Sequence, residues 1–148
     1  MTLEIKDGVV QTAKAILYHR DIDKFLLVRE PDGRWGLPGG AKEMEDANIL
    51  TALERELFEE ISLRRGEYTV FNTEVSNKFK YDVKNDERWG LDAVNNFFLV
   101  EVNDIRGIMK AEELMDMAWF GAEEASLKLD FESLQRGFEK TRKFLKKV

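Results

Sequence analysis

The sequence of 148 residues contains no cysteine and a single histidine, His19. The absence of cysteine excludes disulfide bonds, thiolate metal sites and a cysteine nucleophile, and it fits a cytoplasmic location. No apolar stretch approaches the roughly 20 residues of a membrane-spanning helix, so no membrane partner is expected. The first residues carry mixed charge, which predicts no signal peptide. His19 lies in a polar turn, where a surface position is expected.

The sequence is also short of positive charge, with a formal net charge of -6. Binding to long nucleic acid requires a basic surface, so such a partner is not expected. A small phosphorylated substrate remains compatible, provided that metal ions bridge the like charges. Hydrophobic residues make up 43% of the chain, which is ordinary for a globular protein. We expect one domain that spans residues 1–148, because this length suffices to bury a core.

Clustered and periodic apolar residues predict several strands and two longer helices. We expect strands at residues 9–18, 25–29, 35–37, 70–75, 78–83, 95–102 and 118–120. The first helix is expected from about residue 47 to 61, with Asp46 as N-cap, and the second from about 130 to 147. Their apolar stripes comprise Ile49, Leu50, Leu53, Leu57 and Ile61, and then Leu134, Phe138 and Leu145. This order indicates an α/β fold with a mixed sheet between helices.

Three glutamates share one side of the first predicted helix. Glu56, Glu59 and Glu60 follow one another at helical spacing and span an arc of roughly 100°. Their mutual repulsion destabilises the helix unless a cation lies among them. Carboxylate oxygens are the ligands that Mg²⁺ and Mn²⁺ prefer, and such metals can polarise a phosphoryl group and activate water. Taken alone, the alternative of a solvated helix face is favoured.

The segment Leu37-Pro38-Gly39-Gly40 changes that weighting, because it predicts a glycine turn at which a backbone can approach a ligand. A glycine turn, an acidic loop and then Arg-Glu-Leu-x-Glu-Glu on a helix resemble the Nudix family over about residues 35–63. The matching residues are Gly40, Arg55, Glu56, Leu57, Glu59, Glu60 and Leu63. The resemblance implies an α/β/α sandwich with a mixed sheet between helices.

The match departs from the family signature at three points. Asp46 stands where a glutamate is expected, eight residues instead of seven separate it from Arg55, and Ser62 replaces a glycine. The extra residue is expected in the loop before the helix, where insertions are tolerated and the phase of the glutamates is unaffected. Glu43 or Glu45 are alternatives to Asp46 in its role.

The resemblance also implies roles for individual residues. Glu56, Glu59 and Glu60 would hold Mg²⁺ or Mn²⁺, with the Gly39 carbonyl as a further ligand. Arg55 would orient a glutamate through a salt bridge. Family members often recruit another acid from a loop before a later strand, which makes Glu113 a catalytic candidate and Glu112 its alternative. For either of these two residues, a solvated loop position is the favoured interpretation.

The substrate-binding candidates are Gly39 and Gly40, with Trp89 and Tyr81. Trp89 could stack on a nucleobase or simply anchor its loop, and Tyr81 lies about where dinucleoside polyphosphate hydrolases carry a tyrosine. The resemblance implies a pyrophosphohydrolase of nucleoside diphosphate derivatives, with a nucleoside triphosphate or related nucleotide as the default substrate. The alternatives are a dinucleoside polyphosphate or RNA 5′-end hydrolase, and an inactive nucleotide-binding or regulatory module. A homodimer is a further expectation from the family.

Overall fold

The structure is a computed structural model that describes residues 2–82 and 88–147, so part of the predicted loop 85–90 lies outside the described residues. The described strands form a seven-stranded sheet with the order β3-β2-β1-β6-β5, while β4 pairs with β1 and β7 pairs with β2. The strands are β1 (Val9–His19), β2 (Lys24–Arg29), β3 (Trp35–Gly36), β4 (Gly39–Ala41), β5 (Tyr68–Lys80), β6 (Asp92–Val102) and β7 (Asp116–Phe120). The helices are α1 (Ile49–Ile61), α2 (Ala122–Lys128), α3 (Glu132–Arg142) and the 3₁₀ helix η1 (Lys143–Lys147).

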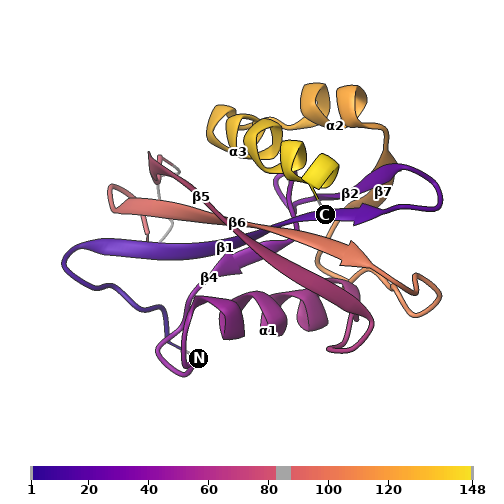
Figure 1. The fold of residues 1–148 in the computed structure, drawn as a ribbon. Coiled ribbons are helices and arrows are strands. Elements are labelled where there is room, and N and C mark those ends of the chain that lie inside the picture. The colour runs from indigo at the N-terminus through magenta and orange to yellow at the C-terminus, as the bar shows by residue number, and fades with distance from the viewer. Residues whose placement is uncertain (1, 83–87, 148) are drawn as a thin grey trace.

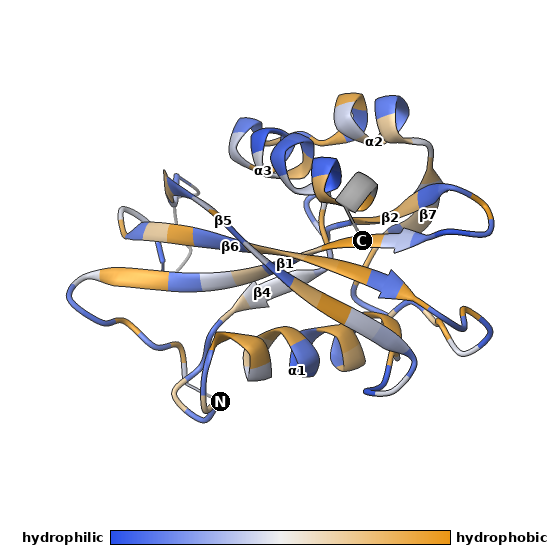
Figure 2. Ribbon diagram, viewed as in Figure 1, coloured by the Kyte–Doolittle hydropathy of each residue, from blue (hydrophilic) through white to orange (hydrophobic). Residues whose placement is uncertain are grey.

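The sheet lies between two helical layers, with α1 on one face and α2 and α3 on the other (Figure 1). Alternate side chains of β1 serve the two faces, because successive residues of a strand point in opposite directions. Ala13 and Ala15 pack in the cluster that contains Leu57 of α1, whereas Ile16 packs with Phe138 of α3. In Figure 2, hydrophobic stretches run through β1 and β6, while much of α3 is hydrophilic. The predicted α/β/α sandwich is confirmed.

Strand β1 changes its neighbour along its length, and this opens the sheet at one edge. It runs parallel to β6 from Val9 to Tyr18. On its other side it pairs with β4 at residues 12–14 but with β2 only at Tyr18 and His19. β1 and β6 are parallel neighbours joined through α1 and β5, and the sheet is therefore mixed, as expected.

The segment predicted as a glycine turn is instead strand β4. Gly39 and Gly40 lie opposite Lys14 and Ala13 in an antiparallel ladder, so their missing side chains permit close strand pairing instead of a turn. The predicted surface position of His19 is also wrong. His19 is 8% exposed at the end of β1, and its ring centroid lies 6.0 Å from that of Trp119.

Other differences concern the ends of the elements. Leu50, predicted in the buried stripe, is 40% exposed and lies near the start of α1. The strands predicted at 70–75 and 78–83 lie largely in the single strand β5, which ends at Lys80 and has a register irregularity between Asn72 and Val75. Residue 83 lies outside the described residues. The last predicted helix is shorter and is preceded by α2.

No helix in the described part of the chain is long and apolar enough to cross a membrane.

Helix α1 is capped by Asn48 and not by Asp46. The Asn48 side chain accepts a hydrogen bond of 2.9 Å from the backbone N–H of Thr51. We expect Asn48→Ala to lower the free energy of unfolding by about 1 kcal/mol, because an N–H of the first turn loses its acceptor. Urea unfolding followed by circular dichroism measures the change. Asn103→Ala, at an exposed turn position, is the control, and equal values for the two variants would contradict the assignment of the cap.

Candidate active site

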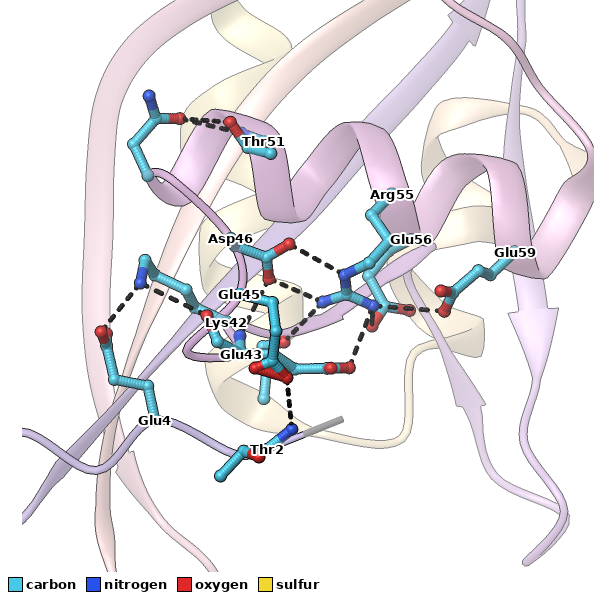
Figure 3. A network of polar contacts seen from close by, with 12 residues as sticks. Thr2, Glu4, Lys42, Glu43, Glu45, Asp46, Thr51, Arg55, Glu56 and Glu59 are labelled. Atoms are coloured by element: carbon cyan, nitrogen blue, oxygen red, sulfur yellow. Dashed lines mark hydrogen bonds and ion pairs between the residues drawn. The ribbon is translucent and has the colours of Figure 1, made fainter.

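Arg55 lies at the centre of a network of carboxylates on α1 and the loop before it (Figure 3). Its Nε and Nη2 donate to the two oxygens of Asp46 at 3.0 and 2.9 Å. Its Nη1 donates to Glu56 at 3.0 Å and to Glu59 at 3.2 Å, and it lies 3.2 Å from Glu43. One guanidinium group therefore fixes two of the three helix glutamates relative to the preceding loop.

Asp46 takes part in this network through a buried carboxylate that is 6% exposed. It forms a bidentate pair with Arg55 and also accepts the backbone N–H of Glu43 at 2.9 Å. The hydrogen bonds from Arg55 are the largest cause that holds the Asp46 pKa below its usual value. The aspartate that replaces the expected glutamate thus forms an ion pair with Arg55 from the loop before α1, which begins at Ile49.

The carboxylate of Glu60 is hydrogen-bonded to the backbone of strand β4. The backbone N–H of Gly39 donates to its Oε1 at 2.8 Å. Burial raises the pKa of Glu60 to about 8, and the charges of Glu56 and Glu30 add to the increase, while the Gly39 hydrogen bond and Lys14 oppose it. A buried carboxylate in this environment favours a proton or a cation as its partner.

Both glycines of β4 lie in close contact with their surroundings. Gly39 adopts φ +140°, and a Cβ at this position would lie 1.9 Å from the carbonyl oxygen of Ala13. A Cβ at Gly40 would lie 2.6 Å from the carboxylate of Glu56. Glu56 is half-buried, and burial is the largest cause of its raised pKa. The glycine pair therefore lets two helix glutamates approach the backbone of the sheet.

These residues line a pocket of about 1050 Å³ that also includes residues at the start of α3. The residues that matter for its chemistry are the acids Glu30, Glu43, Glu56 and Glu60, the cations Lys14, Arg34, Lys80 and Arg88, and the aromatic residues Phe79, Tyr81 and Phe131. The acids come mainly from α1 and the chain around β2 and β4, whereas the aromatic residues come from the end of β5 and the start of α3. The pocket thus offers both carboxylate oxygens and flat apolar surfaces.

The aromatic residues are held by neighbouring rings and cations. Phe79 and Tyr81 contact edge to face at 4.8 Å, and the Arg88 guanidinium lies 4.6 Å from the Tyr81 ring centre. Arg34 lies 4.4 Å from the ring centre of Phe131. Aromatic faces bind nucleobases by stacking, and stacking of this kind tolerates any base.

The structure brings some of the predicted site residues together and not others. Glu56, Glu60, Gly39, Gly40 and Tyr81 all line the pocket. Glu59 lies outside the pocket lining, with a side chain that is 46% exposed, and it contacts Arg55.

Arg55, Trp89 and Glu113 also lie outside the pocket lining. Trp89 is 56% exposed in a turn, and Glu113 is exposed in the loop before β7. Sequence reasoning missed Glu30, Lys14 and Phe131, which do line the pocket. The sequence signal that was available is Lys14, which is the one charged residue within the predicted strand at residues 9–18.

The carboxylate oxygens of Glu56, Glu59 and Glu60 are donors of the kind that divalent cations prefer. Among the described residues, no three acidic side chains form a ready-made ion-binding cluster, because Arg55 draws one oxygen of Glu56 and one of Glu59 toward itself. The second oxygens of both remain available, as does Oε2 of Glu60. Glu60, with its pKa raised to about 8, would be stabilised as an anion by a cation nearby. These hard oxygen donors fit Mg²⁺ or Mn²⁺.

Stability is expected to depend on pH through Glu60. Its pKa rises from 4.5 to about 8 on folding, so its contribution to stability without metal is full below pH 4.5 and is lost as pH rises through 8. We expect melting temperatures in EDTA to fall over this window and Mg²⁺ to restore more stability at pH 8.5 than at pH 6. Glu60→Gln should flatten the pH dependence. An unchanged dependence in that variant would refute the assignment.

An α/β/α sandwich in which an Arg-Glu-x-x-Glu-Glu helix lies beside a Gly-Gly strand defines the Nudix class of hydrolases. The sequence matches the NUDIX domain over residues 10–142, and the chain therefore belongs to this family. No curated protein sequence matches the chain significantly. The family match confirms the predicted Nudix resemblance and the class of hydrolases that act on pyrophosphate bonds, a class that generally uses divalent metals.

Solved structures with the same fold cover nearly the whole chain. The E. coli dihydroneopterin triphosphate pyrophosphohydrolase is 19% identical, with a TM-score of 0.77 over 91% of this chain and 94% of its own. A C. elegans Ap4A hydrolase complex is 20% identical, with a TM-score of 0.78 over 94% and 99%. The NUDIX domain of Shewanella oneidensis NrtR, in complex with ADP ribose, is 22% identical, with a TM-score of 0.68 over 92% and 88%. At these sequence identities, the structural similarity to the three proteins establishes the fold of this chain.

Proposed function

We propose that the protein is a Mg²⁺- or Mn²⁺-dependent pyrophosphohydrolase of nucleoside diphosphate derivatives, with a nucleoside triphosphate or related nucleotide as substrate. The observation that carries the proposal is one pocket that holds Glu56 and Glu60 together with the aromatic residues Phe79, Tyr81 and Phe131. A nucleotide presents a polyphosphate at one end and a flat base at the other. In the pocket, the carboxylates would hold metal ions against the polyphosphate, and the aromatic rings would stack on the base.

In this mechanism Glu56, Glu59 and Glu60, with the Gly39 carbonyl, would hold the metal. The metal would polarise the phosphoryl oxygens and lower the pKa of an attacking water. Arg55 positions the glutamates, since its Nη1 donates to Glu56 and Glu59. Glu60 is bonded to the Gly39 N–H at Oε1 only, so its Oε2 is the atom that can contact a cation or accept a proton.

A dinucleoside polyphosphate is the second candidate substrate. Two observations support it: Tyr81 lines the pocket, and Phe131 lines it from a different element, which provides two separate stacking surfaces. The similarity in fold to the C. elegans Ap4A hydrolase is consistent with this candidate. An inactive binding module is disfavoured, because Arg55 and all three helix glutamates are present and Glu56 and Glu60 reach the pocket.

A substrate panel tests the proposal. The purified chain would be incubated with Mg²⁺ or Mn²⁺ and nucleoside triphosphates, dinucleoside polyphosphates, ADP-ribose and 5′-triphosphate RNA. Release of phosphate or pyrophosphate, together with the nucleotide products, identifies the bond that is cleaved. Preferred cleavage of dinucleoside polyphosphates or RNA would move the assignment to the corresponding alternative. Binding of nucleotides without turnover of any member would favour the inactive module.

A further inference from the structure

Lys14 is a cation at the floor of the pocket, in the middle of β1. It lies opposite Gly39 of β4 and beside Phe97 of β6. Because strand residues alternate, it shares its face with Ile16, which packs toward α3. Lys14 is half-buried and lines the pocket. Its side chain therefore contributes positive charge to the pocket lining.

The charge of Lys14 acts on three pocket acids at once. It lowers the pKa of Glu30, Glu56 and Glu60, against the increase that burial causes in each of them. Nevertheless, no carboxylate of the described residues lies within ion-pair distance of Lys14. Its ammonium group is thus close to the acidic end of the pocket but is not tied to one acid.

Two other cations of the pocket, Arg34 and Lys80, each lie within ion-pair distance of a carboxylate. Arg34 pairs with Asp32 at 3.0 Å, and Lys80 lies 3.7 Å from Asp92. A half-buried ammonium group that lacks such a partner among the described residues retains its capacity to donate to an incoming anion. Lysine binds phosphate well as a point charge, and partial burial strengthens that attraction.

We propose that the Lys14 ammonium group binds a phosphate of the substrate on the Gly39 side of the pocket. The inference rests on the proposed function, since it assumes a substrate that carries a pyrophosphate group. Acids alone would repel such a substrate. Lys14 supplies positive charge from the protein itself, next to the place at which Glu56 and Glu60 would hold a metal. It is a binding residue for the polyphosphate chain.

The test measures binding of imidodiphosphate, a non-hydrolysable pyrophosphate analogue, by calorimetry at saturating Mg²⁺. We expect Lys14→Met to weaken binding by about 10-fold or more, because one charge-assisted hydrogen bond is lost. Lys14→Arg should retain most of the affinity, because it keeps the charge. Lys24→Met, which removes an exposed lysine at the start of β2, is the matched control. Lys14→Gln and thermal melting of each variant guard against a folding defect.

The outcomes separate this inference from the proposed function. If Lys14→Met and Lys14→Gln bind imidodiphosphate as the wild type does, Lys14 only balances the charge of the acids, and the inference is wrong even if nucleotides are hydrolysed. If the wild type hydrolyses no nucleotide but binds the analogue through Lys14, the inference stands and the proposed function fails. If the wild type does not bind the analogue with Mg²⁺ present, the inference is overturned.

Discussion

Replacing Glu60 with glutamine is expected to lower kcat by about 10²- to 10⁴-fold, the range found when a positioned acid or base is lost. Glutamine keeps the shape of the side chain and can still accept the hydrogen bond from the Gly39 N–H through its carbonyl oxygen. It loses the negative charge that would hold the metal. The fold should be kept, since the neutral side chain also removes the cost of burying a charge. Steady-state kinetics on the best substrate of the panel measures the effect.

The control for Glu60→Gln lies on the same helix. Glu54→Gln also removes one carboxylate from α1, but Glu54 pairs with Arg65 at 2.8 Å and does not line the pocket. Its kcat should match that of the wild type. Glu59→Gln should also abolish turnover, although its side chain is more exposed and its bond to Arg55 contributes less to stability. Wild-type rates for Glu59→Gln and Glu60→Gln, with Mg²⁺ saturating, would show that the site is misassigned.

The sequence was sufficient to predict the layers of the fold and the acidic face of α1. Both depend on local periodicity: Leu53, Leu57 and Ile61 recur at helical spacing and are buried, while the glutamates occupy the other side. The prediction covers β1 nearly in full and the C-terminal part of β6, where the apolar residues of each strand are concentrated. The family match then agrees with the signature that this helix carries.

The features that were missed depend on contacts between distant parts of the chain. Asp46 has the residue type and the position of an N-cap, and its actual role requires Arg55 to fold back over the loop. The Gly39-Gly40 pair is typical of a turn, and becomes a strand only because β1 lies beside it. Lys14 belongs to β1 and Glu30 follows the end of β2, and both line the pocket although they are far apart in the sequence. Local sequence patterns do not carry this information.

Gly39→Ala is expected to lower the free energy of unfolding by about 3 kcal/mol or more, as the sum of backbone strain and overpacking. The position has φ +140°, and the new Cβ would lie 1.9 Å from the carbonyl oxygen of Ala13 and 3.0 Å from the Cα of Lys14. These are backbone atoms of β1, which no rotation of a side chain can move away. Relief requires β4 to separate from β1, and this also breaks the hydrogen bond from Gly39 to Glu60.

Gly66→Ala is the matched control for this substitution, because Gly66 has φ +94° and no atom within 4 Å of an added Cβ. It bears the conformational strain without the clash, so we expect a loss of about 1 kcal/mol. Urea unfolding of both variants separates the two contributions. Because β4 carries one of the contacts that hold Glu60, the catalytic rate of folded Gly39→Ala should also fall, while that of Gly66→Ala should not. Equal stability of the two variants would show that β4 does not pair closely with β1.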